Sequence, residues 1–353
     1  MMLRLLFLLT TVPLLLEAQR MPGDSILAHQ RSIDRPITLH EGQLRITGAY
    51  DLSLHARRFD ARGETINLRD AGTASIRNHY TLDLKYGITQ FIQLTAAVAA
   101  TGHVVKERTQ NIPADQGDPA VSHRVERRYS GIGDLLLGVD LRAPLRTRKL
   151  DIAVAVAALL PTAISEPSEP EHSFEASQQD GSPLHRYVYR YHNPPGNGVV
   201  IASVGAKAKY RTARWAFSSG VDYRHGLEDG TSIEWRHQLA PNGIFEYRKI
   251  PVTYRLPDSF DYFVEVEFQP SSSVDLFLNA SGYTAYRGWT SRQDDLKVAV
   301  PYQTVLFCSP GVEILITPRL WLRERFDIAL VGKNHDAILG AETTVMYNLF
   351  PWR

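Results

Sequence analysis

Apolar and polar residues alternate one by one along most of this sequence, and this two-residue period constrains the fold more than any other feature. Between residues 134 and 142, Leu135, Leu137, Val139 and Leu141 fall on one side, and glycine and charged residues occupy the positions between them. Successive side chains of a β-strand point to opposite faces, whereas a helix requires a period of 3.6 residues. The alternation therefore predicts β-strands.

Segments with the same alternation continue to the end of the sequence. They cover residues 44–54, 76–86, 92–98, 152–158, 200–210, 215–224, 262–268, 274–280, 305–316, 320–330 and 339–349. Two places depart from the pattern. The phase changes at Pro310 and Gly311, which we interpret as a β-bulge. Glu324 falls on the apolar face, and the sequence offers no reason for it beyond a position near a membrane interface.

Connections between these segments alternate in length. Short turns are expected near residues 87–89, 144–148, 211–213, 270–272 and 317–318, and long polar loops at 60–73, 106–130, 162–197, 227–259 and 287–301; the last connection, near 333–335, is brief. Transmembrane β-barrels have short periplasmic turns and long external loops. The sequence therefore predicts an all-β fold, a transmembrane antiparallel up-and-down β-barrel of about twelve strands.

Two alternatives remain open at this level. The runs 244–247 and 252–254 form either an extra hairpin above the membrane or two further strands, which would make about fourteen. A soluble β-sandwich shows the same alternation but does not require loops on one side only. Aromatic residues favour the barrel, because they gather where interfacial girdles are expected. These are Tyr86, Tyr210, Trp215, Phe268, Tyr347 and Phe350 at the short-turn ends, and Tyr50, Tyr223 and Tyr262 toward the other end.

The amino terminus has the pattern of a secretory signal peptide. Arg4 precedes an apolar stretch from Leu5 to Leu16, and Ala18 marks a plausible cleavage site. About a dozen apolar residues that include Pro13 are too few to span a bilayer. We therefore expect residues 1–18 to be a signal peptide, 19–40 a short periplasmic segment, and 41–353 an outer-membrane barrel.

Composition narrows the range of partners. The sequence has 39 Lys and Arg residues against 38 Asp and Glu, a formal charge of +1, and this balance argues against a nucleic-acid partner. Cys308 is the single cysteine, which excludes an intramolecular disulfide and a thiolate zinc cluster. The expected partners are outer-membrane lipid, a small-molecule solute of unknown identity and, during biogenesis, the barrel-assembly machinery.

Two local motifs resemble a known family. The run 86–90, Tyr-Gly-Ile-Thr-Gln, leads into an alternating strand, and residues 131–138, Gly-Ile-Gly-Asp-Leu-Leu-Leu-Gly, open another. Both are similar to segments of the MetA-pathway phenol-degradation and FadL-like outer-membrane β-barrel transporters. The resemblance implies an exported barrel that passes hydrophobic or aromatic small molecules. The sequence departs from FadL-like proteins in having only about twenty residues before the first strand, which is short for an amino-terminal plug.

If the apolar faces contact lipid, the charged residues on the other face point into the lumen. Both signs of charge are present, so they can pair and hold the wall, or form charged constrictions that select solutes. The lumen-lining candidates are Arg45, Arg77, Asp83, Lys85, Asp134, Asp140, Arg142, Asp151, Lys207, Lys209, Asp222, Arg224, Glu265, Glu267, Asp275, Arg323, Arg325, Asp327 and Glu342.

Catalytic and metal motifs are weak in this sequence. His172 and Ser173 are adjacent but lie in a polar loop, no Gly-x-Ser-x-Gly elbow occurs, and the histidines lack metal-ligand spacing. We therefore expect no enzyme activity, cofactor or metal. The predicted function is an outer-membrane channel for small, hydrophobic or aromatic solutes. The alternatives are a non-conducting barrel whose extracellular loops bind a ligand or partner, and a lipid hydrolase that uses Ser173.

Overall fold

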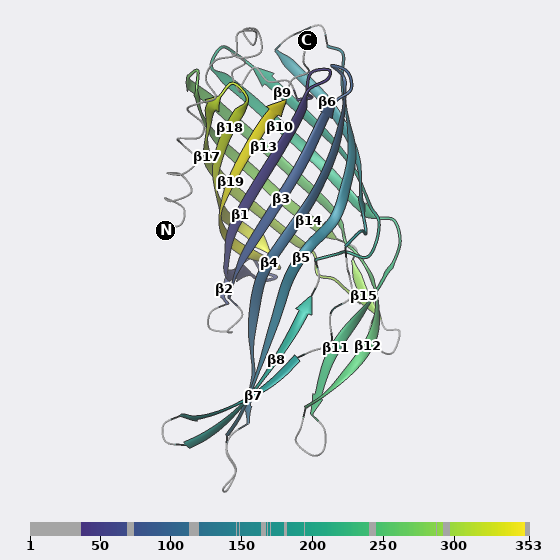
Figure 1. Cartoon of the computed structure of the whole chain (residues 1–353), viewed down its shortest axis with the longest axis vertical. Coiled ribbons are helices and arrows are strands. Elements are labelled where there is room, and N and C mark those ends of the chain that lie inside the picture. The colour runs from purple at the N-terminus through teal and green to yellow at the C-terminus, as the bar shows by residue number, and fades with distance from the viewer. Residues whose placement is uncertain are drawn as a thin grey trace.

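A computed structural model shows the chain as an all-β protein built around a closed barrel (Figure 1). It describes residues 37–349 except 69–73, 113–119, 146, 148, 164–166, 168, 170, 180–181, 194, 240–244, 287 and 292–296. The predicted signal peptide and residues 19–36 of the predicted periplasmic segment lie outside this range. Among the described residues, no helix is long and apolar enough to cross a bilayer.

Twelve of the described strands form the barrel, as predicted. They are β1 (Leu44–Phe59), β3 (Ser75–Gly87), β4 (Ile92–Ile112), β5 (Ala120–Arg142), β6 (Leu150–Leu160), β9 (Ile201–Arg211), β10 (Trp215–Gly226), β13 (Asp258–Ser271), β14 (Val274–Tyr286), β17 (Gln303–Thr317), β18 (Leu320–Lys333) and β19 (His335–Leu349). Each pairs antiparallel with the next in this order, and β1 pairs with β19. The ring is therefore closed and has no free barrel edge, which excludes the sandwich.

Tight turns gather at one end of the barrel, which we call the short-turn end. Three of them share one device: the hydroxyl oxygens of Thr89, Thr212 and Thr317 each accept a hydrogen bond of 3.1 Å from the backbone N–H three residues later. Local hydroxyl-to-backbone bonds of this kind compete with regular structure and favour turns. Their repetition explains why three strand pairs reverse within two to four residues.

At the opposite, long-loop end, several connections contain strands of their own. The predicted loop 106–130 is wrong in part, because β4 and β5 continue to Ile112 and from Ala120 and extend far beyond the barrel (Figure 1). Strand β8 (Ser182–Asn193) pairs parallel with β5, and β7 (Glu171–Gln179) pairs with β8. Strand β2 (Thr65–Asn67) pairs with β1.

A separate four-stranded sheet lies outside the barrel, and it includes the segment between β10 and β13 that the sequence could assign either to a hairpin or to two barrel strands. It consists of β11 (Gly230–Leu239), β12 (Phe245–Arg255), β15 (Trp289–Ser291) and β16 (Lys297–Ala299). The described residues of these runs, 245–247 and 252–254, thus lie in a hairpin outside the ring. The alternative of fourteen barrel strands is wrong.

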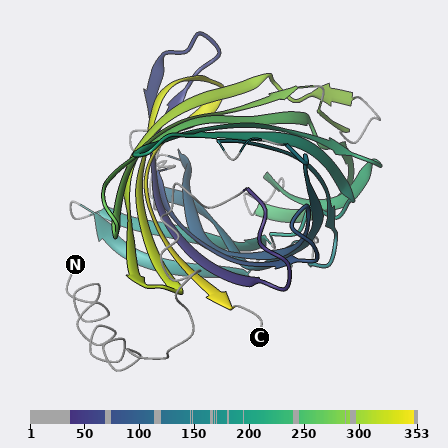
Figure 2. The same cartoon turned by 90° about the horizontal axis from the view of Figure 1, so that it is seen from above.

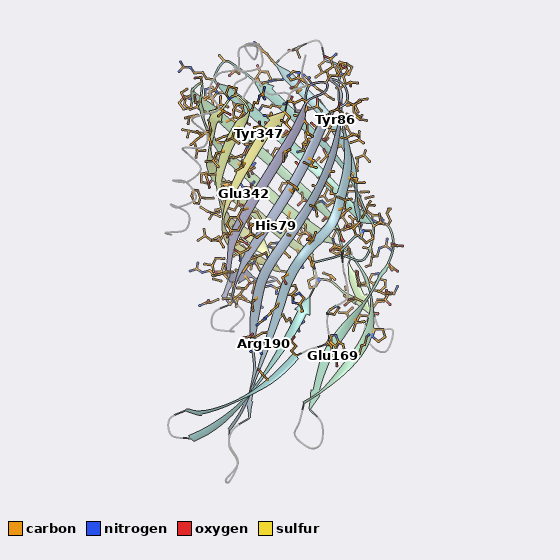
Figure 3. All side chains as sticks on the ribbon, viewed as in Figure 1. His79, Tyr86, Glu169, Arg190, Glu342 and Tyr347 are labelled. Carbon is orange, nitrogen blue, oxygen red and sulfur yellow. The ribbon has the colours of Figure 1, made fainter. Side chains whose placement is uncertain are left out.

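The two faces of the barrel wall differ as the alternation predicts. Large apolar side chains are exposed on the outside, among them Ile76, Leu137, Val156, Val264, Leu278 and Leu330, and the aromatic Tyr86, Tyr210, Trp215 and Tyr347 lie with them. Figure 3 places Tyr86 and Tyr347 near the short-turn end. By contrast, the charged Asp151 is among the best-buried side chains. This inversion of the usual arrangement suits a barrel whose outer surface contacts acyl chains.

Glu324 is on the outer face, as its place in the sequence indicated. Its carboxylate accepts a hydrogen bond of 2.9 Å from the hydroxyl of Thr343 on β19. A carboxylate that has a hydrogen-bond donor costs less to remove from water than an isolated one.

The predicted bulge at Pro310 and Gly311 is wrong. Strand β17 keeps one register with β14 through both residues, and its shifts against β18 lie near residues 306–307 and 315–317. The phase of the apolar pattern changes because Val305 and Phe307 point into the barrel, whereas Val312 and Ile314 point out. Val305 is 1% exposed.

Candidate functional site

The interior of the barrel is the candidate site, because it gathers charged side chains from all parts of the chain. All nineteen predicted lumen-lining candidates lie on barrel strands. The structure divides most of them into two groups that differ in burial and in how their ion pairs are formed. Whether any of them lines a route for solutes stays a prediction.

The first group, the short-turn tier, lies next to the tight turns. It consists of Asp140, Arg142, Asp151, Lys209, Arg211, Glu265, Glu267, Glu313 and Arg323. At its centre, the carboxylate of Asp151 is held between the guanidinium groups of Arg142 on β5 and Arg211 on β9, and its side chain is only 2% exposed. A carboxylate so deeply buried is tolerated because two cations compensate its charge.

Two lysines of β9, Lys207 and Lys209, form ion pairs that skip one strand of the barrel. Lys209 belongs to the short-turn tier, and Lys207 lies beside it. The ammonium of Lys209 lies 3.4 Å from the carboxylate of Glu267 on β13, and between them is β10, where Ala216 pairs with Glu267. Lys207 lies 3.7 Å from Asp140 on β5, across the alanine row of β6. Small residues on the intervening strand leave room for the long lysine side chains. Both pairs therefore join strands that are not neighbours in the barrel wall.

Arg323 makes the longest of these reaches. Its guanidinium pairs with Glu265 on β13 and with Glu313 on β17, and it lies over the ring of Phe277 at 3.8 Å from the centroid. Phe277 occupies the space beside Gly311, where a Cβ would collide with the ring. The arginine is thus fixed by two charges and a cation–π contact, a geometry that suits a planar guanidinium.

The chain before β1 adds to this closure. Residues 38–43 curve inside the short-turn mouth (Figure 2), where the backbone N–H of Leu39 donates to the side chain of Gln93 at 3.0 Å. The amide of Gln43 donates to Asn348 at 3.1 Å, and Thr38 is fully buried. Burial and the charge of Arg142 lower the pKa of His40 below its ordinary value. A described segment of only six residues therefore covers part of the mouth.

The second group, the accessible tier, lies farther along the strands, and Figure 3 places its Glu342 near mid-height beside His79. It consists of Asp51, Asp222, Arg224, Asp261, Arg325, Asp327 and Glu342. Arg224 lies 3.0 Å from both Asp222 and Asp261, and Arg325 lies 2.9 Å from both Asp327 and Glu342. The side chain of Arg224 remains 51% exposed and that of Asp261 35%. Solvent therefore reaches this part of the inner face.

The other predicted candidates belong to neither tier, and each has its own contacts. Arg45 donates to Asn348 at 2.9 Å, and Lys85 pairs with Asp83 at 2.9 Å on the same strand. Asp275 is 3% exposed. Asp134 holds the loops, because its two carboxylate oxygens accept hydrogen bonds from the backbone N–H groups of Ala163 and Asn197.

Apolar and aromatic side chains also face inward, which the sequence did not indicate. His335 contacts the rings of Tyr283 and Phe307, with centroids 5.8 and 6.5 Å apart. Tyr283 pairs with Val305 across β14 and β17, so these residues form one apolar and aromatic group at the long-loop half of the interior. The two-residue period shows which residues share a face but not which face points inward. Apolar residues on the inner face therefore could not be recognised from the alternation alone.

Three charged residues of the interior were missed for a simpler reason. Arg211 and Asp261 lie just beyond the ends assigned to their strands, and Glu313 lies in the segment where a bulge was expected. Extending each strand by two residues at the same period finds Arg211 and Asp261 on the polar face. The two-residue period at the strand ends therefore identifies these two residues.

Comparison with known proteins agrees with this fold. No known family profile matches the sequence, and no curated protein sequence is significantly similar. Among solved structures, an outer membrane channel from Pseudomonas putida F1 is similar over 88% of this chain and 97% of that one, with 13% identity and a TM-score of 0.57. The P. putida toluene transporter TodX overlaps over 94% and 95% (11% identity, TM-score 0.45), and the NalP translocator domain of Neisseria meningitidis over 88% and 90% (8%, 0.45).

The first of these similarities concerns the fold alone. The chain has the fold of a twelve-stranded outer-membrane β-barrel channel, with tight turns at one end and long, partly structured loops at the other. The resemblance to FadL-like outer-membrane barrels is confirmed at the level of the fold. At 13% identity, the similarity carries no residue's role from one protein to the other.

Proposed function

We propose that the protein is an outer-membrane channel for small solutes, with its short-turn end in the periplasm and its long loops outside the cell. The observation that carries this proposal is the accessible tier, since charged side chains deep in a closed barrel keep up to half of their surface exposed. A polar, hydrated interior is what a channel barrel needs, whereas a purely structural core would be dry and apolar.

The group formed by Tyr283, Val305, Phe307 and His335 supports apolar or aromatic solutes as the substrate class. It faces the interior at the end where solutes would enter from outside the cell. Aromatic rings bury large areas and favour other rings in offset or edge-on contact. An entrance of this kind concentrates small aromatic molecules above the charged tiers.

A non-conducting barrel is the second candidate, and the short-turn tier favours it. Strand-skipping ion pairs and residues 38–43 cover part of the mouth there. A closed mouth that does not open would leave the long loops as the functional surface.

Liposome swelling with the folded, purified protein separates the two candidates. Folding is first established by heat-modifiable gel migration, because an unheated barrel stays compact. The proposal expects swelling with small neutral solutes, and faster uptake of a small aromatic alcohol than of a sugar of similar mass. Folded protein that admits no solute class refutes the channel and supports the loop-binding alternative.

A further inference from the structure

Three side chains at the long-loop half of the interior form a linear hydrogen-bonded relay. Ser53 and His55 are two residues apart on β1, so both point to the inner face. The hydroxyl of Ser53 lies 3.2 Å from Nε2 of His55, and the opposite ring nitrogen, Nδ1, lies 2.8 Å from Oδ2 of Asp336 on β19. Serine, histidine and carboxylate joined through opposite imidazole nitrogens are the arrangement that activates a serine nucleophile.

The carboxylate determines which nitrogen carries the proton. An ionised Asp336 can only accept, so Nδ1 of a neutral His55 donates to it and Nε2 is left with a lone pair. The hydroxyl of Ser53 can then donate to Nε2, and the carboxylate of Asp51 is a second acceptor within reach of the same hydroxyl. His55 is thereby placed as a general base for Ser53, and Asp336 as the residue that positions it.

A diagonal contact across the pair of β1 and β19 brings the three residues together. His55 pairs with Ile338 on β19, and Asp336 lies two residues beyond Ile338 on the same inner face; the register of β1 with β19 shifts just after His55. Bulges of this kind re-aim side chains and are frequent beside active sites. His55 is 2% exposed and Ser53 5%, whereas the Asp336 side chain is 34% exposed. The imidazole is therefore protected from bulk water.

Neighbours of Ser53 on both adjacent strands suit a reacting carbonyl group. Gly340, its partner on β19, has no side chain, and a Cβ there would lie 3.6 Å from that of Ser53. Arg77, its partner on β3, has a buried Nε with no hydrogen-bond partner among the described residues. A guanidinium beside the nucleophile provides the positive charge that a tetrahedral oxyanion requires.

We propose that Ser53, His55 and Asp336 form a serine hydrolase site for small carboxylic esters that enter the barrel from the long-loop end. Asp51 and Asp327 lie on the other side of Gly340, 3.5 and 3.6 Å from the position of its missing Cβ. Their negative charges favour neutral or cationic esters over anionic ones. The activity requires that esters reach the interior but not that they cross the barrel, so it goes beyond the proposed channel function.

The reaction follows from these positions. The Oγ atom of Ser53 attacks the ester carbonyl carbon as its proton moves to Nε2 of His55, and Arg77 stabilises the resulting oxyanion. Collapse breaks the ester C–O bond, and His55 protonates the departing alkoxide to give the alcohol. Water, deprotonated by His55, then hydrolyses the acyl-serine, which releases the carboxylic acid and restores Ser53.

Covalent labelling of the folded full-length chain tests the nucleophile directly. A fluorophosphonate probe is expected to modify Ser53, located by mass spectrometry, and p-nitrophenyl butyrate is expected to be hydrolysed. Ser53→Ala should lower the rate by at least about a thousandfold. Ser281→Ala is the matched control, since this inner-facing serine on β14 lies outside the relay; it should retain the wild-type rate and the Ser53 adduct.

Asp336→Asn tests the positioning role. It is expected to lower kcat by about 10²- to 10⁴-fold with little change in KM, because an amide favours the wrong imidazole tautomer. A variant that only loosened the fold would instead lose heat-modifiable migration and raise KM. The proposal is overturned if the wild-type protein migrates as a folded barrel but forms no Ser53 adduct and hydrolyses the ester no faster than Ser53→Ala. Conductance is measured separately, so failure of the channel function does not affect this outcome.

Discussion

In the short-turn tier, Lys209 and Arg323 reach across one or two intervening strands to carboxylates that are about 10% exposed, whereas in the accessible tier each arginine pairs with carboxylates on its own or the adjacent strand. The Asp222 and Asp261 side chains there are 30% and 35% exposed. Both tiers contain arginine and carboxylate side chains, and β13 and β18 contribute to both. A pair that skips strands needs space over the strands between: Ala216 leaves it for Lys209, whereas Arg323 lies over the ring of Phe277.

This difference has an energetic consequence. A buried ion pair is costly to break, because the charge that remains has lost its hydration and its partner, whereas an exposed pair is replaced by water at little cost. The short-turn tier should therefore hold the barrel together, and the accessible tier should determine what the interior attracts.

The largest expected effect follows from neutralising Asp151. Asp151→Asn leaves the guanidinium groups of Arg142 and Arg211 facing each other in a buried site, and we expect it to lower the free energy of unfolding by about 3–5 kcal/mol. Urea unfolding in lipid vesicles, followed by tryptophan fluorescence, measures it. Asp222→Asn in the accessible tier is the control and should cost less than about 1 kcal/mol. Equal losses in the two variants would remove the energetic distinction between the tiers.

A second test concerns the packing that supports Arg323. Gly311→Ala places a methyl group against both the Phe277 ring and the backbone carbonyl oxygen of Glu324, so the ring with the guanidinium over it and the adjacent strand must shift; we expect a loss of about 1–3 kcal/mol in the same unfolding assay. Gly48→Ala on β1 is the matched control. No atom lies within 4 Å of its added Cβ, and the stability should be unchanged or slightly higher. A neutral Gly311→Ala would show that the wall is loosely packed there.

A third test concerns the charge of the accessible tier, which has five carboxylates and two guanidinium groups. This excess should make the channel prefer potassium over chloride by about two- to tenfold at low salt, and less at high salt. The triple variant Asp51→Asn, Asp327→Asn, Glu342→Gln should abolish the preference. Reversal potentials in a KCl gradient across a planar bilayer provide the measurement. Conduction with chloride preference in the wild type would contradict the charge assignment, whereas absence of any conduction would count against the channel itself.

Strands, their alternation and the position of tight turns could be predicted from the sequence, because a lipid-facing wall imposes a period of two on every strand. The accessible tier was nearly complete by the same argument: Asp222, Arg224, Arg325, Asp327 and Glu342 all fall at polar positions of alternating segments. Asp51 falls on the same face of its segment but was not among the candidates, and Asp261 lies just before the start assigned to its strand. The inward-facing Val305 and Phe307 were misjudged, since the period cannot tell an apolar residue that faces the interior from one that faces lipid.

Contacts between distant strands were out of reach of the sequence. The relay of Ser53, His55 and Asp336 joins residues up to 281 positions apart, and the pairing of β1 with β19 that brings them together has no local signature. Likewise, the ion pair between Arg323 and Glu265 spans two strands, and Gly311 and Phe277 lie on those strands beneath it. Both depend on register around a closed ring, which is a property of all twelve strands together.

The smallest expected effect concerns His40, in the segment that covers the short-turn tier. Burial, with the charge of Arg142 beside it, lowers the pKa of His40 below 6.5, so the docked segment favours the neutral imidazole. The undocked segment binds a proton more readily, and docking is therefore fully favourable at higher pH and weakens as the pH falls through about 6.5. We expect conductance to rise modestly between pH 8 and pH 5, because a loosened segment uncovers the mouth. His40→Gln should flatten this dependence and leave conductance at pH 8 unchanged. A rise that persists in His40→Gln would place the titrating group elsewhere and leave the short-turn mouth insensitive to this segment.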